Sequence, residues 1–260
     1  LTLSKSAADE MTDANLSLTV TPAYPMDSPW ELIMCLTAGA AMVLTRRYSP
    51  SNYCSLVHKY GATVSWATMA AWIFKQPASD LDRTHRLRFV FIGAFPPHLH
   101  QPFEARFNVK AREAYGMTEI GTGMFVPLED DHMTGSGSVG KPPDFREVRI
   151  VGPDGQDVRR GEIGELLVRG PGIFKGYYNK PRETAEAFAG DWFRTGDLFR
   201  EDDNGYYYIV GRKKDMVRRS GDNISASEVE NVLTSHPGIM SAAVVPVPDE
   251  SRGEEVKAYI

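Results

Sequence analysis

The sequence predicts an α/β fold that continues into antiparallel strands and ends in part of a small α+β domain. Up to about residue 122, short apolar strand patterns alternate with helix patterns. Beyond that point polar and apolar residues alternate and hairpin turns appear, and from about residue 212 a capped helix stands between apolar strands. We therefore expect a parallel sheet covered by helices in 1–122, a small antiparallel sheet or barrel in 123–211, and part of an α+β unit in 212–260.

Strand and helix patterns alternate regularly in the first region. Strands are expected at 18–20, 41–44, 63–66, 88–92 and 109–114. Helices are expected at 29–38 and 49–60, then up to about residue 76, and at 97–107. Pro29 and Pro50 begin two of these helices, where a proline is tolerated. Alternation of this kind indicates a parallel sheet covered by helices.

The second and third regions show hairpin and capping patterns. Strands at 146–151 and 163–169, a short helix at 181–188, and the turns Pro153-Asp154-Gly155 and Asp203-Asn204-Gly205 indicate an antiparallel sheet. Further on, a short strand at 216–217 precedes a helix that ends near residue 235, and apolar strands follow at 239–246 and at the end of the chain. The spacing Ser227-x-x-Glu230 predicts a capping box at the start of that helix.

Composition excludes several classes of function. Of the 260 residues, 42% are hydrophobic and 24% charged, which is ordinary for a globular protein. The net charge of −5, with no long Lys/Arg run, argues against a broad nucleic-acid-binding surface. Cys35 and Cys54 are too few for a disulfide framework, so we expect a reducing, cytoplasmic location. No apolar run reaches the roughly 18 residues needed to span a bilayer, and we expect no transmembrane segment.

Two segments with polar or small residues follow predicted strands of the first region. Tyr115-Gly116-Met117-Thr118-Glu119 offers an aromatic face, a hydroxyl and a carboxylate, while Gly93-Ala94-Phe95 would admit a flat ring against the backbone. Ligands of open α/β sheets bind beyond the carboxyl ends of the strands. A nucleotide site with Mg²⁺ on Glu119 is therefore one interpretation, and a plain polar loop explains each segment taken alone equally well.

Later segments add groups that suit a ribose. Asp197 lies in Arg194-Thr195-Gly196-Asp197, and a carboxylate can accept from both hydroxyls of a ribose diol. Arg212 follows the strand 206–210 and supplies forked donors. Lys214 stands between two predicted domains and suits a hinge. The simpler interpretations are a plain turn for Asp197 and a solvated linker for Lys214. The six histidines show no metal-ligand spacing, so zinc is not expected.

In their order, these segments resemble the adenylate-forming superfamily, which includes acyl-CoA synthetases, firefly-type luciferases and peptide-synthetase adenylation domains. The segments that carry the resemblance are Ala114–Glu119, Gly164–Leu166, Gly176–Asn179, Trp192–Asp197, Gly211–Asp215 and Gly221–Glu230. The resemblance implies that 1–122 is part of the α/β lobe of the large N-terminal domain. It further implies that 123–211 is a β-barrel subdomain and that 212–260 is part of the C-terminal domain.

The resemblance also implies roles for single residues and the cofactors ATP, Mg²⁺ and CoA. The nucleotide-binding set would be Gly93, Ala94, Phe95, Tyr115, Gly116, Met117, Thr118, Asp197 and Arg212. Within it, Tyr115 would stack on adenine, and Asp197 with Arg212 would hold the ribose. Thr118 and Glu119 would be catalytic, at the AMP phosphate and at Mg²⁺. Lys214 would be the hinge, and Gly221 would line the tunnel for CoA.

Softer cues point to the crotonobetaine/carnitine-CoA ligase branch and to a small-molecule carboxylic acid as substrate. They are Thr21–Tyr24 with Met26-Asp27, Lys59–Val64 and Phe174–Tyr177. Pro25 departs from that branch, which has a histidine there. The alternatives are an amino-acid-activating domain that loads a carrier protein, for which Asp27 is available, and an inactive nucleotide-binding fragment.

Both ends of the chain also bear on activity. The chain begins with Leu1, and its last strand pattern, ending at Ile260, stops without a turn. No phosphate-binding loop precedes residue 20, and the chain stops before the position of the family's C-terminal lysine. We therefore expect a fragment that is inactive by itself, while the oligomeric state stays open.

Overall fold

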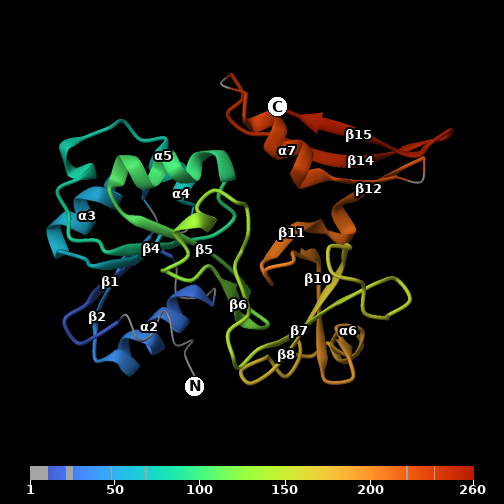
Figure 1. The fold of residues 1–260 in the computed structure, drawn as a ribbon, viewed down its shortest axis with the longest axis horizontal. Coiled ribbons are helices and arrows are strands. Elements are labelled where there is room, and N and C mark those ends of the chain that lie inside the picture. The colour runs from blue at the N-terminus through green and yellow to red at the C-terminus, as the bar shows by residue number, and fades with distance from the viewer. Residues whose placement is uncertain (1–10, 22–25, 48, 68, 221, 237) are drawn as a thin grey trace. The chain divides into compact units, whose positions relative to one another are not determined.

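The protein is described by a computed structural model that covers residues 11–21, 26–47, 49–67, 69–220, 222–236 and 238–260 (Figure 1). The predictions that fall on Pro22–Pro25 and on Gly221 lie outside these described residues. Contacts divide the chain into two compact units. The first runs up to Glu147 and includes Gly170–Lys175, and the second comprises Val148–Arg169 and Gly176–Ile260. The three-part division at residues 122 and 211 stays a prediction.

The first unit contains the predicted parallel sheet. Its strands are β1 (Leu16–Thr19), β2 (Ala41–Leu44), β3 (Val64–Trp66), β4 (Phe89–Ile92), β5 (Lys110–Met117) and β6 (Gly121–Phe125). They lie in the order β2-β1-β3-β4-β5-β6, and every neighbouring pair is parallel except β5–β6. The helices are α2 (Asp27–Ala38), α3 (Tyr53–Tyr60), α4 (Ala70–Phe74) and α5 (Pro97–Phe107), with 3-10 turns at Pro50–Asn52, Asp80–Asp82 and Asp131–Met133.

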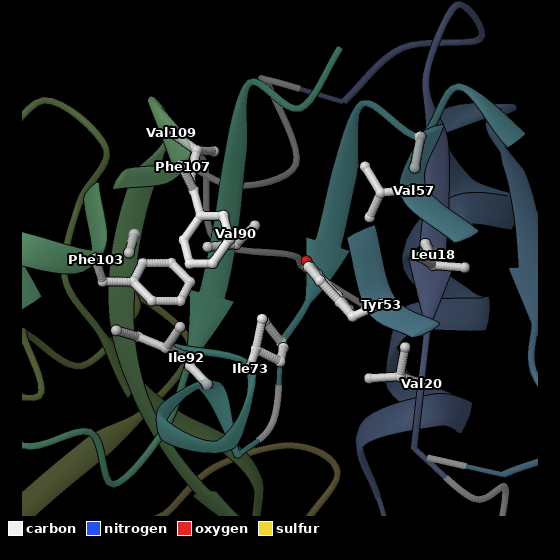
Figure 2. Packing of buried hydrophobic residues seen from close by; sticks show 14 of the residues in the cluster. Leu18, Val20, Tyr53, Val57, Ile73, Val90, Ile92, Phe103, Phe107 and Val109 are labelled. Carbon is white, nitrogen blue, oxygen red and sulfur yellow. The ribbon is translucent and has the colours of Figure 1, made fainter. Parts of the chain in front are cut away.

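Apolar side chains cover both faces of this sheet. Within β4, Val90 and Ile92 belong to a core cluster with α3, α4 and α5, whereas Phe89 and Phe91 belong to a second cluster with α2. Figure 2 shows the first cluster, in which Phe103 and Phe107 of α5 approach Val90 and Ile92. Since successive side chains of a strand point to opposite faces, one continuous apolar strand supplies both layers, as buried parallel strands do.

One strand is longer than predicted. The sequence predicts that a strand ends at Ala114 and that Tyr115 begins a loop, but β5 continues to Met117. The reason is the antiparallel strand β6, which the sequence did not predict and which pairs Gly116 with Thr122. The polar turn is therefore confined to residues 118–120.

The second unit consists of two antiparallel arrangements. Its larger sheet contains β7 (Glu147–Val151), which begins at the last residue of the first unit, with β8 (Gly164–Arg169), β9 (Phe188–Ala189), β10 (Trp192–Glu201) and β11 (Tyr207–Arg212). The strand order is β11-β10-β8-β7, with β9 on β10. The smaller sheet has the order β13-β12-β15-β14 and contains β12 (Met216–Arg219), β13 (Asp222–Ser225), β14 (Ala243–Asp249) and β15 (Gly253–Tyr259). Helix α6 (Pro181–Glu186), a 3-10 turn (Lys213–Asp215) and α7 (Ala226–Thr234) complete the unit.

The cap of α7 differs from the prediction. The helix begins two residues earlier than the spacing indicated, and Ser225, not Ser227, accepts a hydrogen bond from the Glu228 N–H at 3.3 Å. Ser227 Oγ instead donates to the Val210 carbonyl, and Glu230 accepts from the Val244 N–H at 2.8 Å. The predicted capping box is therefore wrong, because tertiary contacts use both of its side chains.

No helix among the described residues is long and apolar enough to cross a membrane.

Candidate functional site

Two of the predicted site segments lie side by side at the ends of neighbouring strands. Gly93-Ala94-Phe95 follows β4, and a Cβ placed on Gly93 would lie 3.5 Å from the Ala114 carbonyl oxygen of β5. Ala94 has a φ of +52°, a left-handed conformation that is uncommon for a residue with a side chain. Such backbone outliers persist where the surroundings enforce them, and they cluster at functional sites.

A buried carboxyl group holds the first of these segments. Glu113 of β5 is 7% exposed, and its Oε1 accepts a hydrogen bond from the Phe95 N–H at 3.2 Å. Burial raises the pKa of Glu113 to about 8, although the backbone N–H groups of Phe95 and Ala94 act in the opposite direction. Glu113 thus ties the end of β5 to the left-handed turn after β4.

The tyrosine of the second segment is buried against a backbone made of small residues. A Cβ at Gly123 of β6 would lie 3.1 Å from the Tyr115 ring, so the ring fits because position 123 has no side chain. Gly116 is equally constrained, since a Cβ there would lie 2.6 Å from the Gly121 carbonyl oxygen. The Tyr115 hydroxyl donates to the Met117 sulfur at 3.9 Å.

The hydroxyl and carboxylate of this segment stand in the turn between β5 and β6. Thr118 is exposed and Glu119 is half-buried. The Glu119 carbonyl accepts a hydrogen bond from the Phe174 N–H at 2.8 Å, which ties the turn to the segment Gly170–Lys175 of the same unit. Both side chains are thus placed on an anchored backbone.

The donor set of this turn fits a magnesium ion that is shared with a phosphate. Magnesium prefers oxygen ligands and is commonly held by one or two carboxylates together with substrate phosphates and water. Among the described residues there is no cluster of three or more His, Cys, Asp or Glu that could hold a metal by itself. With Glu119 as a protein ligand, phosphate oxygens and water would complete the coordination.

The turn is also bound by a buried guanidinium. Arg146, which is 8% exposed, donates to the carbonyls of Ile120, Thr122 and Pro171. Burial lowers the pKa of Arg146 below its ordinary value. Its contacts join the C-terminal end of the turn that holds Glu119 to Pro171.

The second unit contains the predicted ribose pair. Asp197 of β10 is paired in register with Arg212 of β11, and the Arg212 Nε lies 3.1 Å from Asp197 Oδ1. Asp197 is buried and its backbone N–H donates to Thr195 Oγ1 at 3.1 Å, whereas the Arg212 side chain is 56% exposed. The pair thus offers a fixed carboxylate next to a guanidinium that solvent or a ligand can reach.

A second carboxylate in this unit connects the β-sheet to the predicted hinge. Glu165 of β8 lies 2.8 Å from Arg194 and 3.0 Å from Lys213. Burial would raise the pKa of Glu165, but the bonds to these two cations lower it below the ordinary value. Lys214, the predicted hinge residue, is exposed in the 3-10 turn Lys213–Asp215.

Three charged residues at these sites were not among the predicted site residues, namely Glu113, Arg146 and Glu165. Each lies within a predicted strand, at 109–114, 146–151 and 163–169 respectively. The predicted strands 109–114 and 146–151 contain three charged residues each, so no local signal singles out Glu113 or Arg146.

Two family models match the chain. The model described as AMP-binding enzyme matches residues 3–178, and the model described as AMP-binding enzyme C-terminal domain matches residues 228–260. The chain belongs to the AMP-binding enzyme family. The first match alone covers more than half of the chain, and it includes the two strand-end segments of the first unit.

Characterised relatives of this AMP-binding chain are CoA ligases. It is 36% identical over 230 residues to the sulfoacetate–CoA ligase of Cupriavidus necator, covering 86% of this chain and 45% of the relative. It is also 36% identical over 254 residues to the crotonobetaine/carnitine–CoA ligase of Proteus mirabilis, and the match covers 95% of this chain and 49% of that relative. The chain therefore spans about half the length of these relatives, and the predicted resemblance to CoA ligases is confirmed.

Solved structures agree with this assignment. ATP-bound MatB from Rhodopseudomonas palustris matches with a TM-score of 0.85 and 29% identity, covering 95% of this chain and 50% of that one. A second match is the o-succinylbenzoate CoA synthetase MenE from Bacillus subtilis in complex with its acyl-adenylate intermediate. Its TM-score is 0.85 at 26% identity, and the match covers 98% of this chain and 53% of that one. The predicted fold class of mixed α/β structure with antiparallel sheets is confirmed.

Proposed function

We propose that the protein containing this chain is an ATP-dependent acid–thiol ligase that makes an acyl-CoA through an acyl-AMP intermediate. The observation that best supports this is the adjacency of Gly93–Phe95 and Tyr115–Glu119 at the ends of parallel strands β4 and β5, in a chain of the AMP-binding enzyme family. That position is where open α/β sheets bind their ligands.

The proposed reaction has two balanced steps. A carboxylate oxygen of the acid attacks the α-phosphorus of ATP, the bond to the β-phosphate oxygen breaks, and pyrophosphate leaves. The sulfur of the CoA thiolate then attacks the acyl carbon, the bond from that carbon to the AMP oxygen breaks, and AMP leaves. Both steps depend mainly on alignment and on stabilising negative charge, so few acid–base groups are required.

The residues of the first unit suit the adenine and phosphate end of this reaction. We propose that Tyr115 stacks on adenine, that Gly93, Ala94 and Phe95 line the adenine pocket, and that Gly116 and Met117 complete that part of the site. The Thr118 hydroxyl would bond the α-phosphate, and Glu119 would bind Mg²⁺, which offsets the charge of the phosphates when bound. The anchored backbone of residues 118–120 supports these roles.

The residues of the second unit suit the ribose and the conformational step. We propose that Asp197 accepts from the ribose hydroxyls while Arg212, its ion-pair partner at 3.1 Å, contacts the same sugar. Lys214 would be the hinge, and Gly221 would line the CoA tunnel. A hinge lets a single nucleotide site serve two successive steps.

The substrate is proposed to be a small carboxylic acid. The relatives are named for sulfoacetate and for crotonobetaine or carnitine, and short- and medium-chain acids are further candidates. We also propose that the protein acts in the cytoplasm, where ATP and CoA are supplied together.

The test uses the full-length protein that carries this chain. Pyrophosphate release should depend on an acid from a panel of sulfoacetate, carnitine, crotonobetaine, and short- and medium-chain acids, and CoA thioester should then form. We expect Asp197→Asn to raise the KM for ATP by roughly 10- to 100-fold, which corresponds to a lost charged hydrogen bond of about 1.5–3 kcal/mol.

Asp202→Asn is the matched control for this test. Asp202 lies in the same hairpin as Asp197 but bonds locally, to the N–H groups of Asn204 and Tyr206. Asp202→Asn should therefore leave the KM for ATP unchanged. The proposal fails if no acid in the panel supports pyrophosphate release, and thioester formation on a carrier protein but not on CoA would assign the amino-acid-activating alternative.

A further inference from the structure

Arg146 makes an unusual set of contacts for a buried arginine. Its Nε donates to the Thr122 carbonyl at 3.3 Å, and its two terminal nitrogens donate to the carbonyls of Ile120 and Pro171. All three acceptors are backbone oxygens, and they come from two segments that are about 50 residues apart in the chain. The guanidinium fork can reach several acceptors at once, which an ammonium group cannot do in the same geometry.

Among the described residues, the charge of Arg146 is balanced by carbonyl dipoles and by the Phe145 ring, whose centroid lies 5.1 Å from its Cζ. Within the part of the chain that the structure describes, no carboxylate forms an ion pair with it, and burial is the cause of its lowered pKa. A buried cation without a counter-ion costs free energy, so its retention needs a reason beyond local packing.

Glycines surround the guanidinium. A Cβ on Gly170 would lie 3.4 Å from one terminal nitrogen of Arg146, and Cβ atoms on Gly121 and Gly172 would lie 3.6 and 3.9 Å from the other. At these distances a Cβ would make ordinary van der Waals contact with the guanidinium, so the backbone of both segments passes close to it.

The two segments that Arg146 joins are the ones that hold Glu119. Ile120 directly follows Glu119, and Phe174, three residues after Pro171, donates its N–H to the Glu119 carbonyl at 2.8 Å. Phe174 thus binds the Glu119 carbonyl itself, and Arg146 binds the carbonyl of the next residue, Ile120.

We propose that Arg146 is a positioning residue that locks the turn 118–122 onto the segment Gly170–Lys175 and so fixes the Glu119 carboxylate in the orientation that metal binding requires. The proposal rests on the proposed function for the role of Glu119, but the clamp itself does not depend on it. Removing the fork keeps the Glu119 carboxylate in the protein but releases the backbone next to it, at Ile120 and Thr122. The effect should therefore appear in metal dependence and in local exchange.

The first test measures the clamp directly, by amide hydrogen exchange of the 260-residue chain. In Arg146→Lys we expect faster exchange in peptides that cover 117–124 and 170–176, while peptides from β4 and α5 stay unchanged. The control is Arg83→Lys, since Arg83 also donates to two backbone carbonyls, those of Ala105 and Arg106, but lies elsewhere in the first unit. Unchanged exchange in both test peptides overturns the proposal.

The second test measures metal dependence in the full-length protein. We expect Arg146→Lys to raise the free Mg²⁺ concentration for half-maximal acyl-AMP formation by roughly tenfold, the lower end of the usual effect of groups that orient metal ligands. The KM for the acid should change less than about twofold, and Arg83→Lys should alter neither quantity.

Recovery at high Mg²⁺ separates positioning from misfolding. A displaced but intact site regains its rate when Mg²⁺ is raised, whereas a misfolded fraction, followed by near-ultraviolet circular dichroism, does not. A loss of rate that Mg²⁺ leaves unchanged overturns the role toward Glu119. If the wild-type protein activates no acid, the proposed function has failed, and hydrogen exchange still decides whether the clamp exists.

Discussion

At the scale of single residues, the most consequential group is the buried carboxyl of Glu113. Its pKa is about 8 in the folded chain against an ordinary 4.5, because burial disfavours the charged form. A raised folded-state pKa means that the folded state binds more protons than the unfolded state between these two values. The stability that Glu113 contributes is therefore complete below pH 4.5 and is lost as the pH rises through 8.

We predict that Glu113→Gln removes this pH dependence. The difference in unfolding free energy between the wild type and the variant should fall as the pH rises from 5 to 9, by at most on the order of 4 kcal/mol. Urea unfolding of the chain at several pH values measures it, and the groups that both proteins share cancel in the difference.

Glu255→Gln is the matched control for this prediction. Hydrogen bonds from Arg219 and Arg252 lower the pKa of Glu255 to about 2, so its contribution is present above its ordinary pKa and is lost only in acid. The difference in unfolding free energy between the wild type and Glu255→Gln should be constant above pH 5. If the unfolding free energies of the wild type and Glu113→Gln instead change with pH in parallel, the Glu113 carboxyl titrates near its ordinary value.

Single residues also show what the sequence could not predict. Tyr115, Glu119 and Asp197 were predicted from local segments, because aromatic, hydroxyl and carboxylate groups near glycine are visible in the sequence, and their roles stay predictions. Glu113 and Arg146 were missed because their partners lie 18 and about 25 residues away. Contacts at that distance depend on how strands pair, and no local pattern encodes them.

At the scale of elements, two of the strands that were not predicted depend on their partners. The apolar run of β4 and the helix α5 were predicted almost to the residue, since hydrophobic periodicity is local. By contrast β6 has the sequence Gly-Thr-Gly-Met-Phe and β13 has Asp-Asn-Ile-Ser, which have weak strand propensity. Each exists because a neighbouring strand, β5 or β12, supplies its hydrogen bonds.

The corrected cap of α7 gives a prediction at this scale. Ser225 is buried, caps the helix through the Glu228 N–H and also donates to the Val210 carbonyl, so Ser225→Ala should lower the unfolding free energy by about 1–2 kcal/mol. Ser227→Ala loses a bond to the same carbonyl and one with Ser225 Oγ but leaves the cap in place, so it should cost less. Urea unfolding of both variants measures the difference, and an equal or larger loss in Ser227→Ala would restore Ser227 as the cap.

At the scale of the whole molecule, the order of the motifs was more informative than any single motif. Each segment alone suited a plain turn, yet the ordered set indicated the family that the matches confirm. The identity of the acid did not follow in the same way. Two relatives with the same 36% identity to this chain are named for different acids, so membership of the family does not determine the acid.

The proposed hinge gives the last prediction, for the full-length protein. A proline at position 214 fixes φ near −65° and also restricts Lys213 before it, so one arrangement of the hinge is favoured over the other. The rates of acyl-AMP formation and of thioester formation should therefore separate in Lys214→Pro, with their ratio changing on the order of 100-fold.

Lys214→Ala keeps the backbone free, and since the Lys214 side chain is exposed, that ratio should stay within about threefold. Rapid quench of the two half-reactions measures both rates. If both fall by the same factor in Lys214→Pro, the segment is a structural turn and the conformational change pivots elsewhere.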